Sequence, residues 1–389
     1  MQLAPAEEKM WEESRAKNRV NRMTDEQINA KYESGEQRIL TEMNREKLPS
    51  FAQALKKIGY MDVRPFYQRR SRWDEKMQSR LIESFLINIP VPPIILYEKD
   101  YNSYEVMDGQ QRITAIQAFY ENKLVLTGLE LWSELEGRTY NTLPAKIKAG
   151  IDRRSISSIV LITESTSDPE EAFFLKQLAF ERLNTGGVAL SRQEIRNCLY
   201  SGKFNQLLFE LASHSIFAEA WGIPVDNDEE IVQNNLYKKM EDVELVLRFF
   251  ALRHIEDFRR GMEGFLDLYM IKSLNFSDED IDILRDIFHN TVNLAHKIYG
   301  DNLFKPFDPE ANNWKNKAYK AYYDAVMVGL SSHLADADML VERKSKVIEE
   351  TKKLLKEDKS KLLTGSGKTK ADIQKRIRLF DDMLSQVVK

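Results

Sequence analysis

The most informative stretch of this sequence is Val106-Met107-Asp108-Gly109-Gln110-Gln111-Arg112-Ile113-Thr114. Its first residues end the strand-like segment Tyr104–Met107, and apolar residues recur at helical spacing after Arg112. A short polar turn with one glycine stands between the two patterns. The sequence therefore predicts a strand, a tight bend at Gly109 and a helix from about Gln111 to Tyr120.

A bend of this kind is suited to binding phosphate. The first N–H groups of a helix lack intrahelical acceptors, and the helix dipole favours an anion at that end. Gly109 lets a phosphate approach the backbone without a Cβ in the way. Arg112 offers a planar guanidinium for bidentate contact, and Asp108 is suited to holding Mg²⁺ or orienting an attacking water. The alternative is an ordinary turn followed by a surface arginine.

The pattern around this bend predicts an α/β core over residues 49–190, in which short apolar runs alternate with amphipathic helices. Asp74–Asn88 is expected to be a helix, with acidic residues in its first turn. Strands are expected at residues 61–65, 94–97, 104–107 and 157–163.

The flanking regions have helical patterns. Residues 1–48 are rich in charge, and their apolar residues have helical spacing, as seen for Ile28, Tyr32, Ile39 and Met43. Ser191–Glu194 has the form of a capping box, and helical periodicity continues from there to the end. We expect an α+β fold with an N-terminal helical arm (1–48), an α/β core (49–190) and a large all-helical C-terminal region (191–389).

Composition narrows the classes of function. The net charge of −4 gives no general basic field, so contact with nucleic acid requires a local basic patch. The single cysteine, Cys198, excludes an intramolecular disulfide, and no Cys/His pair has zinc-ligand spacing. Neither a signal peptide nor an apolar run of membrane-spanning length is present, so we expect a cytoplasmic protein.

A local basic patch is found at Arg64–Trp73, where four arginines stand among three aromatic residues. Guanidinium groups and aromatic rings together suit the phosphates and bases of nucleic acid. We expect nucleic acid to be bound by Arg64, Arg70, Arg72 and Trp73. The alternative is a helix start fringed by arginines over a buried Trp73.

A third polar segment is Glu181–Ser191, which contains Gly186-Gly187. Asn184 and Thr185 precede the glycines and are suited to contacting the sugar or phosphate of a ligand. Helix termination by glycine explains the same residues equally well.

In order and spacing, these segments resemble the GmrSD-type N-terminal domain family, also called domain of unknown function 262. The resemblance covers about residues 45–215 and rests on Pro65–Arg69 with Trp73, Ile89–Ile94, Asp108–Arg112, Glu181–Gly187 and Leu190–Asn197. It implies a ParB/sulfiredoxin-like fold in which the strand–turn–helix element holds the phosphates of a nucleotide. It also implies hydrolysis of a nucleoside triphosphate in a prokaryotic DNA-restriction or anti-phage defence system.

The resemblance and the local chemistry together give the expected site. The catalytic residues would be Asp108, Gln111 and Arg112, with Mg²⁺ on Asp108. The nucleotide would be bound by Gly109, Gln110, Thr114, Tyr67, Gln68, Arg69, Asn184 and Gly186. Two-domain relatives carry an HNH nuclease domain, but residues 216–389 have no His-rich metal motif, so we expect no nuclease within this chain.

One other motif is a misleading match. Thr364–Thr369 resembles a phosphate-binding P-loop, but Leu362 stands where that motif requires its first glycine, and no apolar strand precedes it. We expect a turn between two basic helices.

Three functions remain open. The favoured one is an NTPase or nucleotide-gated switch. The second is a non-enzymatic DNA-binding module. The third is an adaptor whose helical tail docks a separate effector protein.

Overall fold

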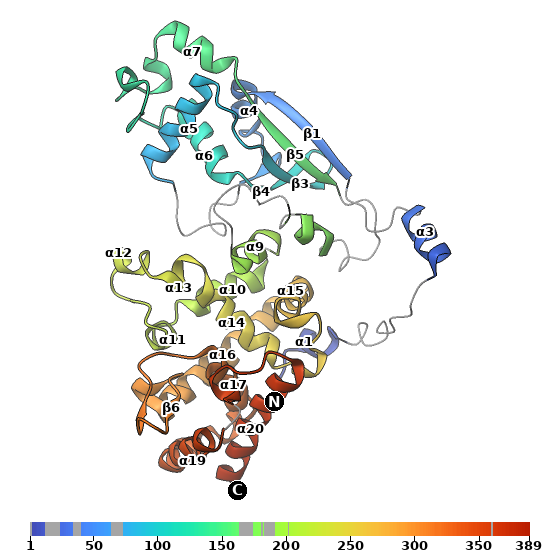
Figure 1. The fold of residues 1–389 in the computed structure, drawn as a ribbon, viewed down its shortest axis with the longest axis vertical. Coiled ribbons are helices and arrows are strands. Elements are labelled where there is room, and N and C mark those ends of the chain that lie inside the picture. The colour runs from blue at the N-terminus through green and yellow to red at the C-terminus, as the bar shows by residue number, and fades with distance from the viewer. Residues whose placement is uncertain are drawn as a thin grey trace. The chain divides into compact units, whose positions relative to one another are not determined.

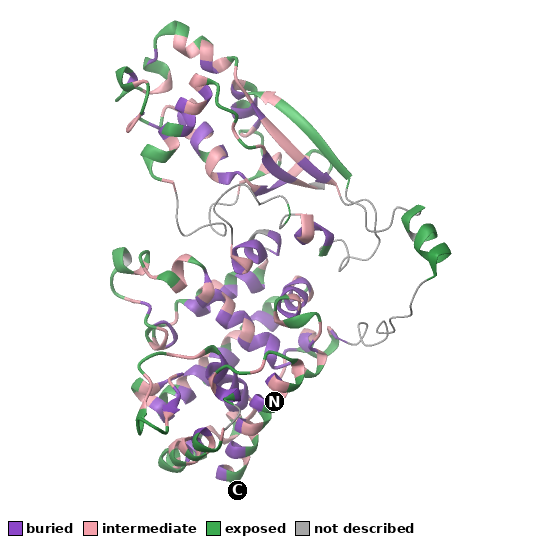
Figure 2. Ribbon diagram, viewed as in Figure 1, coloured by how far each residue is buried: buried purple, intermediate pink, exposed green. Residues whose placement is uncertain are grey.

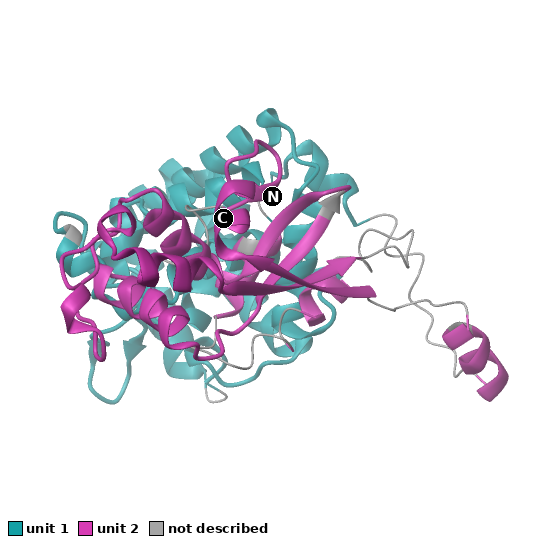
Figure 3. Cartoon of the chain, turned by 90° about the horizontal axis from the view of Figure 1, so that it is seen from above, with its two compact units in different colours: residues 1–21, 200–389 teal, residues 22–199 magenta. Residues whose placement is uncertain are grey.

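The computed structural model describes residues 2–11, 24–33, 40–63, 73–162, 174–179, 182, 191–200, 202–358 and 361–389. The fold is α+β (Figure 1). The chain divides into two compact units, which Figure 3 distinguishes by colour: residues 22–199, and residues 1–21 together with 200–389. We call them the sheet unit and the helical unit.

The sheet unit is built on a mixed five-stranded sheet. Its strands are β1 (Leu40–Lys47), β2 (Met61–Asp62), β3 (Ile94–Asp100), β4 (Ser103–Asp108) and β5 (Ser155–Ile162). Their order is β1-β5-β3-β4-β2, with β5 parallel to β3, β2 parallel to β4, and the other neighbours antiparallel. The strands expected at residues 94–97, 104–107 and 157–163 are confirmed within the described residues. The strand expected at residues 61–65 is present as β2 but ends at Asp62, since Val63 is not in a strand.

Helices cover one face of this sheet (Figure 1). They are α4 (Leu48–Ala54), α5 (Glu75–Ile87), α6 (Gln110–Tyr120) and α7 (Ala145–Asp152). Ile94 and Leu96 of β3 and Ile113 and Phe119 of α6 belong to one buried apolar cluster. Figure 2 shows, in purple, buried stretches on both the strands and the helices of this unit. The expected helix of residues 74–88 is confirmed as α5. Its N-cap is Asp74, whose Oδ1 accepts the Met77 N–H at 2.7 Å.

The other face of the sheet is also covered. Ile95, Met107 and Leu161 are buried there, outside the apolar cluster of the first face. Helix α9 (Arg192–Leu199) contacts β4, and residues 174–179 are helical. Burial on both faces explains why β3 begins with the unbroken apolar run Ile94–Tyr97.

The expected N-terminal helical arm is partly wrong. Helix α3 (Asp25–Glu33) is present, and its described side chains are exposed, but Leu40–Lys47 form strand β1. This strand pairs along its whole length with β5. Met43 of this strand is 77% exposed. Because β1 has no buried apolar face, its sequence lacks the alternation of apolar and polar residues that would have predicted a strand.

The helical unit is built around three central helices, α14 (Glu241–Leu252), α16 (Asp278–Tyr299) and α17 (Lys320–Ser332). Around them lie α1 (Pro5–Lys9), α10 (Lys203–Ala212), α11 (Ser215–Ala220), α12 (Asp228–Ile231), α13 (Asn235–Lys238), α15 (Gly261–Ser273), α18 (Ala337–Glu342), α19 (Lys344–Glu357) and α20 (Lys370–Val388). Short 3-10 helices, among them η6 (Leu362–Thr364), complete the connections. Among the described residues, no helix has the length and apolar character that crossing a bilayer requires.

The C-terminal region is not all helical, which corrects the expectation from sequence. Strands β6 (Phe307–Asp308) and β7 (Asn313–Trp314) form a short hairpin. Each strand has only two residues, too few to give a period-two pattern in sequence.

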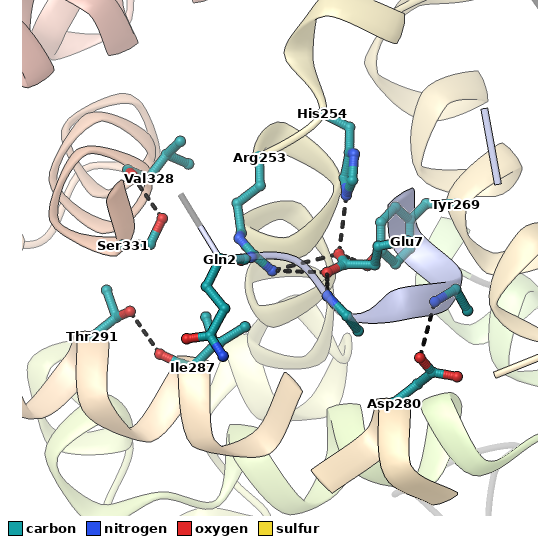
Figure 4. Close-up of polar contacts among 12 residues, drawn as sticks. Gln2, Glu7, Arg253, His254, Tyr269, Asp280, Ile287, Thr291, Val328 and Ser331 are labelled. Carbon is teal, nitrogen blue, oxygen red and sulfur yellow. Dashed lines mark hydrogen bonds and ion pairs between the residues drawn. The ribbon is translucent and has the colours of Figure 1, made fainter. Parts of the chain in front are cut away.

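The N-terminal segment packs into the helical unit through one buried carboxylate (Figure 4). Glu7 is buried, and its Oε1 accepts the Tyr269 hydroxyl at 2.6 Å and lies 3.0 Å from His254 Nε2. Arg253 pairs with the same carboxylate at 3.3 Å. Trp11 continues the contact by stacking on Phe265, with ring centroids 5.4 Å apart.

The charge of Glu7 links this contact to pH. Burial raises the pKa of Glu7, but Arg253, His254 and Tyr269 together outweigh it and lower the pKa from 4.5 to about 2. A carboxyl whose pKa is lower in the folded state adds stability above its unfolded pKa. That stability is therefore complete above pH 4.5 and is lost as the pH falls towards 2.

Replacing Glu7 by Gln is expected to destabilise the helical unit by about 3–5 kcal/mol, because Arg253 would stay buried without its counter-ion. Urea unfolding followed by circular dichroism measures this loss. Glu8→Gln, an exposed neighbour on the same helix, is the matched control and should leave the midpoint unchanged. The wild type should also lose stability more steeply than Glu7→Gln as the pH falls below 4.5. The same acid dependence in both proteins would contradict this role of Glu7.

Candidate functional site

Gly109 alone makes the bend between strand β4 and helix α6. Its carbonyl accepts the Ile113 N–H at 2.9 Å, which closes the first turn of the helix. The backbone N–H groups of Gln111 and Arg112 have no acceptor among the described residues. The expected strand, bend and helix are confirmed, and unpaired donors stand at the positive end of the helix dipole.

The protein's own packing accounts for the glycine. Gly109 has a φ of +97°, a conformation that strains any residue with a side chain. A Cβ at this position would lie 2.5 Å from Ile94 Cγ2 and 2.9 Å from Arg112 Nη2. Those two side chains occupy the side of Gly109 on which we expected phosphate to approach. A phosphate must therefore reach the bend from another direction.

The guanidinium of Arg112 is already engaged with the protein. Its Nη2 donates to Asp108 Oδ2 at 2.9 Å and to the Pro93 carbonyl at 3.3 Å. Its Nε is buried and meets no acceptor in the part of the chain that the structure describes. The Arg112 side chain is 14% exposed and the Asp108 side chain 33% exposed. The residues assigned to phosphate and to metal thus neutralise each other, and Asp108 is the more accessible of the two.

The glutamines of the bend have different positions. Gln111 Oε1 accepts the backbone N–H of Trp73 at 3.2 Å, and Gln78 Nε2 donates to the Trp73 carbonyl at 3.0 Å. These bonds bring together Trp73 and Gln111, which lie far apart in the sequence. Gln110 is buried, whereas Thr114 is exposed on α6.

The other expected site residues lie outside the described part of the chain, and their roles stay predictions. They are Arg64, Tyr67, Gln68, Arg69, Arg70, Arg72, Asn184 and Gly186. The described residues therefore form only one wall of the candidate site.

A small cavity lies on the helix-covered face of the sheet. Its volume is about 140 Å³, and its lining includes Ile94 and Leu96 of β3 together with Glu46 and Tyr60. Burial raises the pKa of both Glu46 and Tyr60. Pockets for ligands of drug size begin at roughly 300 Å³, so this cavity is too small for a nucleoside triphosphate.

Within the described residues, no group of three or more His, Cys, Asp or Glu side chains is placed to hold a metal ion. Mg²⁺ commonly binds through one or two carboxylates and completes its shell with water and substrate phosphate. The exposed part of Asp108 fits that mode of binding.

The P-loop-like segment Thr364–Thr369 does not have the geometry of a phosphate site. Arg376 donates to the carbonyls of Leu362 at 2.7 Å and Gly367 at 3.1 Å. A Cβ on Gly367 would lie 2.5 Å from the Asp372 carboxyl carbon. Carbonyl oxygens and a carboxylate stand where a phosphate needs N–H donors, so this segment is not a phosphate site.

Sequence reasoning missed a buried ion pair on the other face of the sheet. Lys176 Nζ lies 2.8 Å from Glu105 Oε2 and 3.8 Å from the ring centroid of Tyr97. Both charged side chains are less than a tenth exposed. Glu105 is a single acid in an apolar strand, and Lys176 lies far along the chain, so no local pattern indicated the pair.

Helix α9 adds further buried polar groups to this unit. Gln193 Nε2 donates to Asn197 Oδ1 at 3.0 Å, and Arg196 Nη1 donates to Gln193 Oε1 at 3.3 Å. The one signal in the sequence was the polar motif Gln193–Asn197 itself. Such buried networks fix a structure when they are satisfied, and they also mark functional regions.

Residues 51–201 match a family model described as GmrSD restriction endonuclease, N-terminal domain. The match contains strands β2 to β5, the bend at Gly109 and helix α9. No curated protein and no solved structure matches the chain.

Replacing Gly109 by Ala is expected to destabilise the sheet unit through both backbone strain and collision with Ile94. Gly137→Ala is the matched control, because Gly137 has a φ of +75° but nothing within 4 Å of an added Cβ. We expect about 1–2 kcal/mol of strain in both variants and about 1–3 kcal/mol more for Gly109→Ala. Urea unfolding measures the difference. Equal losses would show that the contact with Ile94 does not constrain the bend.

Proposed function

We propose, from the match of residues 51–201 to the GmrSD restriction endonuclease N-terminal domain, that the chain binds and hydrolyses a nucleoside triphosphate at the bend between β4 and α6. The activity would serve a prokaryotic DNA-restriction or anti-phage defence system. The sheet unit would then be a ParB/sulfiredoxin-like core that uses this bend to hold phosphate.

The observation that carries the proposal is the set of unsatisfied donors at the bend. Arg112 Nε is buried without an acceptor, and the N–H groups of Gln111 and Arg112 have none among the described residues. A buried donor without a partner costs about 1–3 kcal/mol. A phosphate group has enough oxygens to satisfy several such donors, and its charge suits both the guanidinium and the helix terminus.

The Asp108–Arg112 ion pair would open when phosphate binds. A buried guanidinium needs a counter-ion, and Asp108 provides it in the structure described here. A phosphate that takes this place would free the Asp108 carboxylate to hold Mg²⁺. The metal would neutralise charge on the phosphates and orient the attacking water.

We assign nucleic-acid contact to the neighbouring basic segment. Trp73 is held at the bend by Gln111, and Arg64, Arg70 and Arg72 precede it closely in the sequence. Tyr67, Gln68 and Arg69 would contribute to the nucleotide pocket, as would Asn184 and Gly186 from the glycine-containing segment. Because Gln111 contacts both Trp73 and the bend, DNA binding would alter the rate of hydrolysis.

Arg112→Lys is expected to weaken triphosphate binding by about 10- to 100-fold, because lysine keeps the charge but loses the planar fork of donors. Titration calorimetry with each of the four nucleoside triphosphates and Mg²⁺ measures the affinity. Arg153→Ala, a change at an exposed arginine of the same unit, is the control and should bind as the wild type does. Absence of binding by the wild type to all four nucleotides would refute the proposal. In that case a salt-dependent gel shift with DNA would support the DNA-binding module instead.

Asp108→Asn is expected to separate hydrolysis from binding. The amide keeps the shape of the side chain but is a poor ligand for Mg²⁺, so phosphate release should fall by at least about 100-fold. Nucleotide binding in the absence of metal should persist. Release of inorganic phosphate is measured with and without DNA. Full hydrolysis by Asp108→Asn would exclude this carboxylate as the metal ligand.

A further inference from the structure

The β6–β7 hairpin of the helical unit borders a cavity of about 410 Å³. Phe307 pairs with Trp314 and Asp308 with Asn313 across the two strands, and the Lys315 N–H closes the hairpin on the Pro306 carbonyl at 2.9 Å. The cavity lies between this hairpin and the start of α17, and it is lined by Asp308, Ala311, Asn313, Trp314, Lys315, Asn316, Lys317 and Tyr319. None of these residues belongs to the proposed triphosphate site.

Two aromatic rings form the flat part of the lining. The Trp314 indole is held edge-on by Phe307 and Tyr299, at centroid distances of 5.7 and 6.2 Å. The backbone of Tyr319 is fixed by its N–H bond to the Phe304 carbonyl at 3.0 Å. Both residues line the cavity and are only partly buried, so part of each side chain is accessible from it.

The charged groups around these rings leave an excess of positive charge. Lys315 is neutralised by Asp308 at 2.9 Å. Lys317 lies 5.6 Å from the Tyr319 ring centroid, and Lys352 lies 5.8 Å from that of Trp314. Neither of these two lysines has an acidic partner among the described residues.

We infer that this cavity binds one nucleotide, with its base stacked on Trp314 or Tyr319 and its phosphate at Lys317. Aromatic rings beside lysines are the elements with which proteins hold unpaired nucleotides, since every base has a flat face and every nucleotide carries a phosphate. Asn313 and Asn316 supply amide groups that can bond the edge of the base. The volume falls within the range of pockets for small ligands.

A neutral sugar is the competing occupant, because indole rings and amides also suit sugars. The charges favour a nucleotide. Both oxygens of the Asp308 carboxylate already accept hydrogen bonds, from Lys315 and from the N–H groups of Glu310 and Ala311, which leaves little capacity for sugar hydroxyls. Lys317 lines the cavity and has no acidic partner among the described residues, so its charge favours an anionic ligand.

Quenching of tryptophan fluorescence tests the proposal on the full chain. The probes are a 12-nucleotide oligothymidylate, a duplex of equal length, free dTMP and glucose. We expect the oligothymidylate to quench wild-type fluorescence and Trp314→Leu to lose that component, with affinity reduced at least about fivefold. Quenching by dTMP as well would identify free nucleotides as ligands, whereas quenching by the strand alone would identify nucleic acid. Quenching by glucose, or by none of the probes, would overturn the proposal.

A second variant, Lys317→Ala, tests the proposal even if Trp314→Leu does not fold. Lys317 is exposed, so we expect its replacement to leave the fold intact. It should reduce the salt dependence of single-strand binding by about 0.7 in the logarithmic slope, the value of one phosphate contact. Lys346→Ala, at another exposed lysine of the same unit, should leave the slope unchanged. An unchanged slope in Lys317→Ala would refute the phosphate contact. Arg112→Lys should not affect quenching of Trp314, so the two proposed sites can fail separately.

Discussion

The close approach of Gly109 to Ile94 is the constraint on which the sheet unit depends. Ile94 begins β3 and is fully buried, while Gly109 directly follows the neighbouring strand β4. With no Cβ between them, α6 can turn back directly over the sheet and bury Ile113 in the shared core. The same turn places the first N–H groups of α6 and the guanidinium of Arg112 at one end of the sheet. The features proposed to bind phosphate are therefore a consequence of how helix and sheet are packed.

Accessibility distinguishes the ion pair at this bend from the other buried pairs of the chain. Glu7 holds Arg253, and Asp324 holds Arg248 through two bonds of 2.6 and 2.7 Å, and both carboxylates are completely buried. Neither can exchange its partner without unfolding, so these pairs serve structure. Asp108 is 33% exposed, and solvent reaches it while Arg112 stays mostly covered. Of these three pairs, the one at the bend has the carboxylate that solvent reaches, and an ionic ligand can take over from a counter-ion more readily when that counter-ion is exposed.

The sequence predicted well those parts of the fold whose causes are local. Helix α5, expected over residues 74–88, spans Glu75–Ile87, because its apolar period and its cap at Asp74 both depend on neighbouring residues. The bend at Gly109 was predicted for the same reason. Strand β1 was not, because pairing with β5 rather than any alternation of its own makes it a strand. The contact of Arg112 with Asp108 was missed because the sequence favours either partner, phosphate or carboxylate, equally.

The two proposed sites recognise different parts of a nucleotide, the phosphates at the bend and the base at the hairpin. Backbone N–H groups and a guanidinium bind phosphates alike, whatever base they carry, so the bend by itself cannot choose among nucleoside triphosphates. Any such choice must come from residues that reach the base, and the sequence supplies candidates in the segment that ends at Trp73. The cavity at the hairpin would instead recognise mainly the base. Trp314 and Tyr319 offer flat surfaces to a base, whereas Lys317 offers only one charge to a phosphate. Stacking tolerates all bases, so selectivity there depends on Asn313 and Asn316, the only uncharged hydrogen-bonding side chains without an aromatic ring in the lining.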